Sequence, residues 1–118
     1  MAWDPKFIVL DEPTVGQDFI EKERLLNLII KLKEEGKGIV IASHDMEFLW
    51  KLRPRVVVMK KGKIVANSSA EETFYNFTLL KENNLLPPQL VELAKSLNLN
   101  KPFYTVEEAK NWILKYLV

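Results

Sequence analysis

Residues 7–18 constrain the fold more than any other segment; they read Phe-Ile-Val-Leu-Asp-Glu-Pro-Thr-Val-Gly-Gln-Asp. Four apolar residues run directly into two adjacent carboxylates, Asp11 and Glu12, and then into a turn that contains proline and glycine. A short continuous apolar run bounded by turn residues is typical of a buried parallel strand. The pattern therefore predicts a strand over 7–10 whose carboxyl end delivers acidic groups to a surface crevice.

A second strand of the same kind is predicted over 38–42, where Gly-Ile-Val-Ile-Ala leads towards His44, the only histidine of the chain. Between the two strands, apolar residues recur at helical spacing over 19–35. Asp18 is suited to be the N-cap of this helix, and Gly36 to be its C-terminal stop. Strand, helix and strand then form a right-handed crossover unit with parallel strands.

Three side chains that carry chemistry fall at the ends of these strands. The carboxyl ends of parallel strands meet at one edge of an open α/β sheet, so Asp11, Glu12 and His44 are expected at a shared rim. Taken alone, an acidic pair is more often a solvated strand end, and a lone histidine is more often satisfied within a turn. The flanking residues favour a functional site instead.

The rest of the chain is predicted to form a hairpin and several short helices. The predicted elements are a helix over 45–52, strands over 56–59 and 63–66, a helix from 69 to about 81, a linker over 83–88, and helices over 88–97 and 105–117. The fold class is α/β: a partial parallel sheet (βαβ plus hairpin) over 1–78, with a small helical extension over 79–118. Two short amphipathic helices cannot bury their apolar faces alone, so the extension must pack on the core or on another chain, and it is a candidate dimerisation element.

Composition excludes several classes of protein. The net charge of +1 arises from balanced acidic and basic residues, which is not the charge distribution of a nucleic-acid binder. Cysteine is absent, so no disulfide framework or thiolate metal site can form, and the composition suits a reducing cytoplasm. No apolar run approaches the roughly 18 residues needed to span a bilayer, so direct membrane insertion is not expected.

Two motifs carry a family resemblance. Residues 10–18 (Leu-Asp-Glu-Pro-Thr-Val-Gly-Gln-Asp) resemble the Walker B motif and D-loop of the ABC-transporter ATPases, and 42–45 (Ala-Ser-His-Asp) resemble their H-loop. The sequence of residues 10–18 is most similar to that of the cobalt-type and energy-coupling-factor (ECF) ATPases, which power vitamin and metal-ion uptake. Residues 79–89 resemble the C-terminal extension of that subgroup. The resemblance implies a P-loop NTPase-type sheet.

The resemblance also implies roles for four residues. Asp11 matches the aspartate that holds Mg²⁺ through water, and Glu12 matches the catalytic glutamate that activates the attacking water. His44 matches the residue that contacts the γ-phosphate, and Asp18 matches the D-loop aspartate at the interface between two ATPase domains. The implied cofactor is Mg-ATP. The implied partners are a homologous ATPase subunit, in a homo- or heterodimer, and transmembrane transporter subunits, which would place the protein in the cytoplasm, peripheral to the inner face of the cell membrane.

Three further motifs of the family, the P-loop, the Q-loop and the signature motif, do not occur in these 118 residues. No two of the four glycines frame the spacing that wraps backbone N–H groups around phosphates. We therefore expect the C-terminal half of the ATPase subunit of an ECF or cobalt-type importer, inactive alone. The alternatives are a non-enzymatic interaction module, whose last two helices bind a partner, and half of a DNA-repair-type ABC ATPase.

Overall fold

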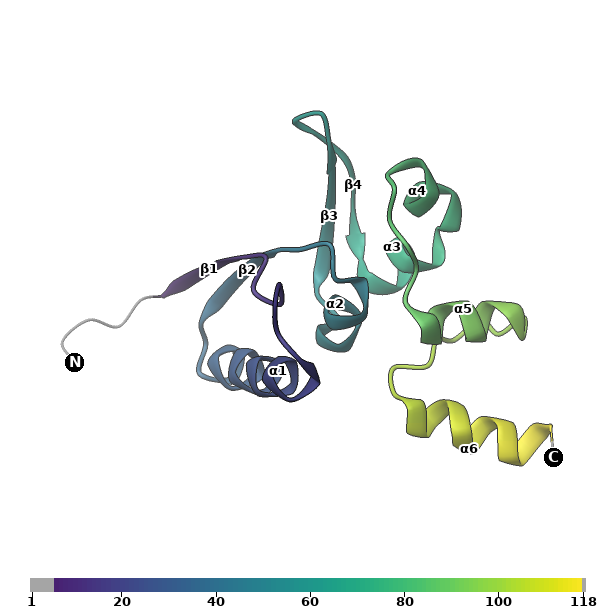
Figure 1. The fold of residues 1–118 in the computed structure, drawn as a ribbon. Coiled ribbons are helices and arrows are strands. Elements are labelled where there is room, and N and C mark those ends of the chain that lie inside the picture. Colours follow the sequence, from purple (N-terminus) through teal and green to yellow (C-terminus); the bar gives the residue numbers. More distant parts are fainter. Residues whose placement is uncertain (1–5, 118) are drawn as a thin grey trace.

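The computed structural model describes residues 6–117, which form two two-stranded sheets and six helices (Figure 1). The helix α2 lies in the middle of the molecule, between the β1–β2 sheet with α1 on one side and the C-terminal helices on the other. The elements in chain order are β1 (Phe7–Asp11), α1 (Phe19–Glu34), β2 (Gly38–Ala42), α2 (Met46–Leu52), β3 (Arg55–Lys60), β4 (Lys63–Ser69), α3 (Ala70–Tyr75), α4 (Phe77–Glu82), α5 (Gln89–Ser96) and α6 (Val106–Tyr116).

The strands β1 and β2 pair in parallel, in a register that joins Phe7 to Gly38 and Asp11 to Ala42. The predicted βαβ unit is thereby confirmed. The helix α1 covers one face of this sheet, where Ile29 packs in a cluster with apolar residues of both strands. Successive side chains of a strand point to opposite faces, and α1 covers only one of them. The prediction of a fully buried strand is therefore wrong for the described chain, in which Val9 is 73% exposed.

The hairpin of β3 and β4 projects from the body of the molecule (Figure 1). Its two-residue turn has positive φ at both Lys61 (51°) and Gly62 (74°), as a type I′ turn requires. Both strands are longer than the predicted 56–59 and 63–66, and β4 runs directly into Ser69, the N-cap of α3. The strands β3 and β4 pair in an antiparallel sheet, with an irregularity in the register between Val58 and Met59.

The helix predicted from 69 to about 81 is two helices, because Asn76 separates them. The backbone of Asn76 (φ −84°, ψ 81°) is non-helical, and it ends α3. Its side-chain oxygen then accepts a hydrogen bond of 3.1 Å from the backbone N–H of Leu79 and starts α4. Asparagine side chains compete with the helical backbone for hydrogen bonds, which is why they favour such caps. The prediction of one continuous helix is wrong.

The C-terminal helices pack on the rest of the chain. Val91 of α5 is completely buried in the main core cluster, together with Trp50 of α2 and Leu80 of α4. A second cluster joins α5 to α6 through Ala94 and Ala109, with Phe103 between them in sequence. The extension therefore buries apolar surface on the core, while two leucines at the end of α6 remain more than half exposed. The division into 1–78 and 79–118 stays a prediction.

Candidate active site

The carboxyl ends of β1 and β2 bring together two residues that are 32 positions apart in sequence. The backbone N–H of Glu12 donates to the carbonyl oxygen of Ala42 at 2.7 Å, which continues the strand pairing beyond Asp11. Past this point, Nδ1 of His44 lies 2.6 Å from Oε1 of Glu12. The His44 side chain is 85% exposed and that of Glu12 is 34% exposed, so the pair lies at an open surface.

The contact between His44 and Glu12 favours one tautomer of the imidazole ring. An ionised carboxylate only accepts hydrogen bonds, so the Nδ1 of His44 is the donor to Glu12. The hydrogen bond of one ring nitrogen sets the tautomer of a histidine. Nε2 of His44 is then the nitrogen left for other partners, as an acceptor when the ring is neutral and as a donor when it is charged.

Glu12 has an unusual backbone conformation. Its φ of 46° lies in the left-handed region, which non-glycine residues adopt at a cost of about 1–3 kcal/mol. The chain reverses there: the N–H of Val15 donates to the carbonyl of Glu12 at 3.3 Å, and the N–H of Gln17 donates to the carbonyl of Thr14 at 3.1 Å. Strained backbone concentrates at functional sites, so this turn supports a role for the Glu12 carboxylate.

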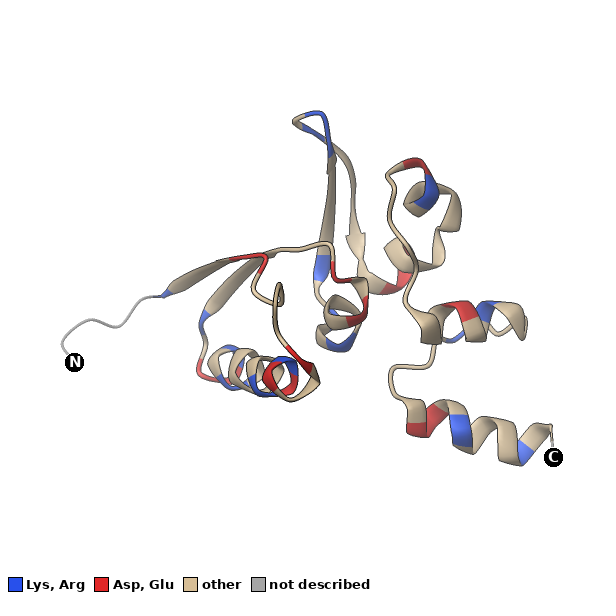
Figure 2. Cartoon of the chain, in the orientation of Figure 1, with Lys and Arg blue, Asp and Glu red and all other residues tan. Residues whose placement is uncertain are grey.

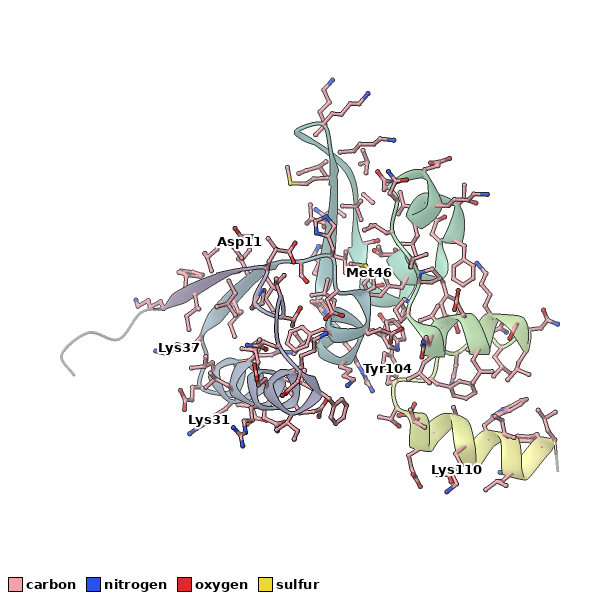
Figure 3. The ribbon with its side chains drawn as sticks, viewed as in Figure 1. Asp11, Lys31, Lys37, Met46, Tyr104 and Lys110 are labelled. Carbon is pink, nitrogen blue, oxygen red and sulfur yellow. The ribbon has the colours of Figure 1, made fainter. Side chains whose placement is uncertain are left out.

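Asp11 and Asp18 lie on either side of this turn. Asp11 is the last residue of β1 and is exposed at the rim of the sheet (Figure 3). Asp18 is the N-cap of α1, as predicted, because its side chain accepts a hydrogen bond of 2.8 Å from the backbone N–H of Glu21. The structure thus brings Glu12 and His44 into contact, and it places Asp18 at the start of the crossover helix.

Asp45 was missed as a residue of this site by the sequence reasoning. Its side chain caps α2 by accepting from the N–H of Phe48 at 3.1 Å, and it accepts from Nζ of Lys22 on α1 at 2.9 Å. Partial burial raises the pKa of Asp45, but the hydrogen bonds from Lys22, Phe48 and Thr14 outweigh it and hold the pKa below its usual value. Asp45 therefore ties the histidine loop to both α1 and α2. The sequence did contain a signal for this role, because Asp45 stands at the predicted start of the helix, where aspartate is a favoured N-cap.

The rim of the sheet fits a magnesium ion that is bound jointly by the protein and a phosphate ligand. It does not fit an ion whose ligands all come from the protein. Among residues 6–117, no group of three or more histidine or acidic side chains is placed to hold a metal ion. Magnesium retains several waters and binds through one or two carboxylates together with substrate phosphates. Asp11 alone, exposed at a strand end, fits that arrangement. A metal held there would need water and phosphate oxygens as further ligands.

A fold comparison indicates the class of protein, because this α/β fold is similar to part of an ABC-transporter protein. The structure is similar to CbiO1 from Clostridium perfringens, part of the ABC transporter complex CbiONQ, with a TM-score of 0.56 and 32% sequence identity. The similarity covers 77% of this chain and 37% of CbiO1. No family model matches the chain.

Sequence comparison narrows the class. The chain is 36% identical to the energy-coupling factor transporter ATP-binding protein EcfA2 of Mycoplasmopsis synoviae, over 99% of this chain and 39% of the relative. It is also 36% identical to EcfA2 of Clostridium tetani, over 98% of this chain and 42% of the relative. The chain is therefore similar, over nearly its whole length, to part of the ATP-binding proteins of energy-coupling factor transporters. It spans about two fifths of the length of these curated relatives.

Proposed function

We propose that this chain supplies part of the ATP-hydrolysing site of an importer's ATPase subunit. The observation that carries the proposal is the 2.6 Å contact between Glu12 and His44 at the carboxyl ends of two paired parallel strands. Ligands of open α/β sheets bind at that edge. The similarity to ECF transporter ATP-binding proteins and to CbiO1 supports the same interpretation.

Each rim residue has a role that its chemistry allows. When Mg-ATP is bound, it supplies the phosphoryl group to be transferred and the charge of the metal. Asp11 would hold the metal through water, and Glu12 would orient and deprotonate the attacking water with the carboxylate oxygen that His44 leaves open. His44, with Nδ1 held by Glu12, would present Nε2 to the terminal phosphate. Asp18 would face a second ATPase domain.

The chain is proposed to be inactive alone. Phosphoryl transfer depends on positioning and on charge neutralisation, and the backbone cradle with its lysine contributes most of both. That cradle does not occur in the 118 residues. Isothermal titration of the chain with Mg-ATP is therefore expected to show no binding tighter than about the millimolar range, about −4 kcal/mol. Micromolar binding would contradict this part of the proposal.

The substrate class and partners are proposed from the relatives. Their names describe ECF transporter ATP-binding proteins, and CbiO1 is part of a transporter complex. We infer import of vitamins or metal ions, with a homologous ATPase subunit and transmembrane subunits as partners, at the cytoplasmic face of the membrane. No helix of the described chain is long and apolar enough to cross a membrane. Acidic and basic side chains both occur on α1 and on α6, which argues against nucleic acid as a partner (Figure 2).

A chimera tests the proposed roles. The matching segment of EcfA2 from Mycoplasmopsis synoviae is replaced by this chain, so that the relative supplies the remainder of the protein. The chimera is expected to hydrolyse ATP. Glu12→Gln is isosteric and removes the base, so it should lower kcat by about 100-fold or more while leaving nucleotide binding intact.

The matched control for this experiment is Glu23→Gln. The Glu23 carboxylate pairs with Lys51 at 2.9 Å on the surface between α1 and α2, away from the rim. Its variant should retain the activity of the unmodified chimera, because exposed ion pairs contribute little. Equal kcat values for the Glu12→Gln and Glu23→Gln chimeras would refute the catalytic assignment of Glu12.

Self-association through the end of α6 is a second candidate function. Leu114 and Leu117, three residues apart, are 54% and 58% exposed, and Tyr116 between them is 60% exposed. We propose that this face contacts a second ATPase subunit. Analytical ultracentrifugation should show a concentration-dependent dimer that Leu114→Glu abolishes and that Leu28→Glu, at a residue 51% exposed on α1, preserves. Strictly monomeric sedimentation would exclude it.

A further inference from the structure

The N-terminus of α5 is capped by a residue from α2. Pro88 is the N-cap of α5 and provides no side-chain hydrogen bond. Instead, the backbone N–H of Gln89 donates to Oε1 of Glu47 at 2.7 Å, across 42 positions of sequence. A carboxylate at a helix N-terminus satisfies an unpaired N–H group and interacts favourably with the helix dipole. The first turn of α2 is therefore bonded to the first turn of α5.

The other end of α2 is held by the loop that precedes α6. Trp50 is 1% exposed, and its indole N–H donates to the carbonyl oxygen of Phe103 at 2.9 Å. The ring of Tyr104, which is labelled in Figure 3, stacks on Trp50 with 4.7 Å between centroids and 11° between planes. The Arg53 guanidinium lies 3.3 Å from the centroid of the Tyr104 ring, and the Tyr104 hydroxyl bonds to Glu71.

These two attachments act on the element that carries the histidine loop. The helix α2 has only seven residues, and the N–H of Met46, its first residue, donates to the carbonyl of His44 at 3.1 Å. At a rise of about 1.5 Å per residue, Trp50 lies only about 6 Å along the helix axis from Met46, the first residue of α2. A groove of about 440 Å³ adjoins the loop and is lined by His44, Glu47, residues 84–87 and Gln89.

We propose that α5 and the loop before α6 set the position of His44 through α2, with Glu47 and Tyr104 as positioning residues. Releasing either attachment removes one of the constraints on α2, so the helix shifts and the loop at its N-terminus follows. The contact between His44 and Glu12 then lengthens. The catalytic meaning of this coupling rests on the proposed function, but the position of His44 can be measured without nucleotide.

The single histidine makes the test direct. Nitrogen-15 NMR of the full chain, at mildly alkaline pH, reports which ring nitrogen of His44 carries the proton. In the unmodified chain, the Nδ1–H form that donates to Glu12 is expected. Tyr104→Ala and Glu47→Ala should each shift the His44 signals towards the Nε2–H form.

Conservative variants separate positioning from simple loss of structure. Tyr104→Phe keeps the ring on Trp50, and Glu47→Gln keeps an oxygen for the Gln89 N–H without the charge, so both should restore the signals of the unmodified chain. Phe7→Ala serves as an exposed aromatic control, because Phe7 is 76% exposed at the start of β1, the end of the strand away from Glu12. It should leave His44 unchanged. Trp50→Phe preserves an aromatic ring but deletes the N–H, so it releases the loop in a second way, with a smaller loss of core volume than Trp50→Ala.

Unchanged His44 signals in Tyr104→Ala, Glu47→Ala and Trp50→Phe would overturn the inference, as would equal shifts in Phe7→Ala. In the EcfA2 chimera, Tyr104→Ala should lower kcat about tenfold with little change in KM, and Tyr104→Phe should recover it. The two proposals fail separately: Glu12→Gln that leaves kcat unchanged refutes the proposed function, whereas the NMR result alone decides the positioning of His44.

Discussion

Replacing Val91 by alanine should reveal how strongly the C-terminal extension is anchored to the core. Val91 is 0% exposed in the cluster that contains Trp50 and Leu80. The change deletes two methyl groups, each worth about 0.8 kcal/mol when buried, and leaves a small cavity. The gain in helix propensity from valine to alanine offsets about 0.5 kcal/mol of this loss. The expected decrease in the free energy of unfolding is about 1–2.5 kcal/mol.

Urea unfolding followed by circular dichroism measures this change. For a chain of this size, the dependence of the unfolding free energy on urea is about 1–3 kcal/mol per molar, so the midpoint should fall by about 1 M. Val106→Ala is the matched control, because Val106 lies in α6 and is 74% exposed. Its unfolding free energy should change by less than about 0.5 kcal/mol.

Equal unfolding free energies for Val91→Ala and Val106→Ala would refute the reasoning. That result would mean that α5 does not bury its apolar face on α2, α3 and α4. An altered urea dependence in Val91→Ala, with an early transition of small amplitude, would show instead that the extension unfolds separately from the core.

Three further outcomes are expected. Asn76→Ala, which removes the cap between α3 and α4, should lower the free energy of unfolding by about 1 kcal/mol in urea unfolding; an unchanged value would show that the cap contributes nothing. Burial and the hydrogen bond to Glu71 raise the pKa of Tyr104 to about 12, so the folded state is favoured below the unfolded value of about 10, and the stabilisation is lost between pH about 10 and about 12. The urea midpoint should fall over that range in the unmodified chain and fall less in Tyr104→Phe, and parallel profiles would contradict the assignment. The lowered pKa of Asp45 stabilises the fold above the unfolded value of about 3.9, and this contribution is lost as the pH falls through the folded value. Below pH about 5 the urea midpoint should therefore fall more steeply with decreasing pH in the unmodified chain than in Asp45→Asn, which cannot titrate, and equal slopes would disprove the contribution of Asp45.

Local features of the fold could be predicted from the sequence because they depend on residues within a few positions of one another. Asp18, Ser69 and Thr105 were predicted to begin helices, and in each case the side-chain oxygen accepts from a backbone N–H three residues later. Asn76 shows the limit of that reasoning. The apolar spacing continues through it, and only its non-helical backbone divides the segment into two helices.

The parallel pairing of β1 and β2 was also predictable, because a helix of 16 residues joins two strands and its handedness is nearly invariant. The burial of the two strands could not be predicted in the same way. A continuous apolar run indicates that both faces are suited to being covered, but the run does not say what covers them. Val9 and Val40 are 73% and 59% exposed because α1 covers a single face of the described sheet.

The sequence by itself determined the types of chemistry present: an acidic doublet after one strand, one histidine after the next, and the motifs that mark the family. Only the tertiary structure decided which of these groups touch. The 2.6 Å contact of His44 with Glu12 spans 32 positions, and the hydrogen bond of Gln89 to Glu47 spans 42. Such contacts depend on how helices and strands pack, a property of the whole chain that no local pattern of residues encodes.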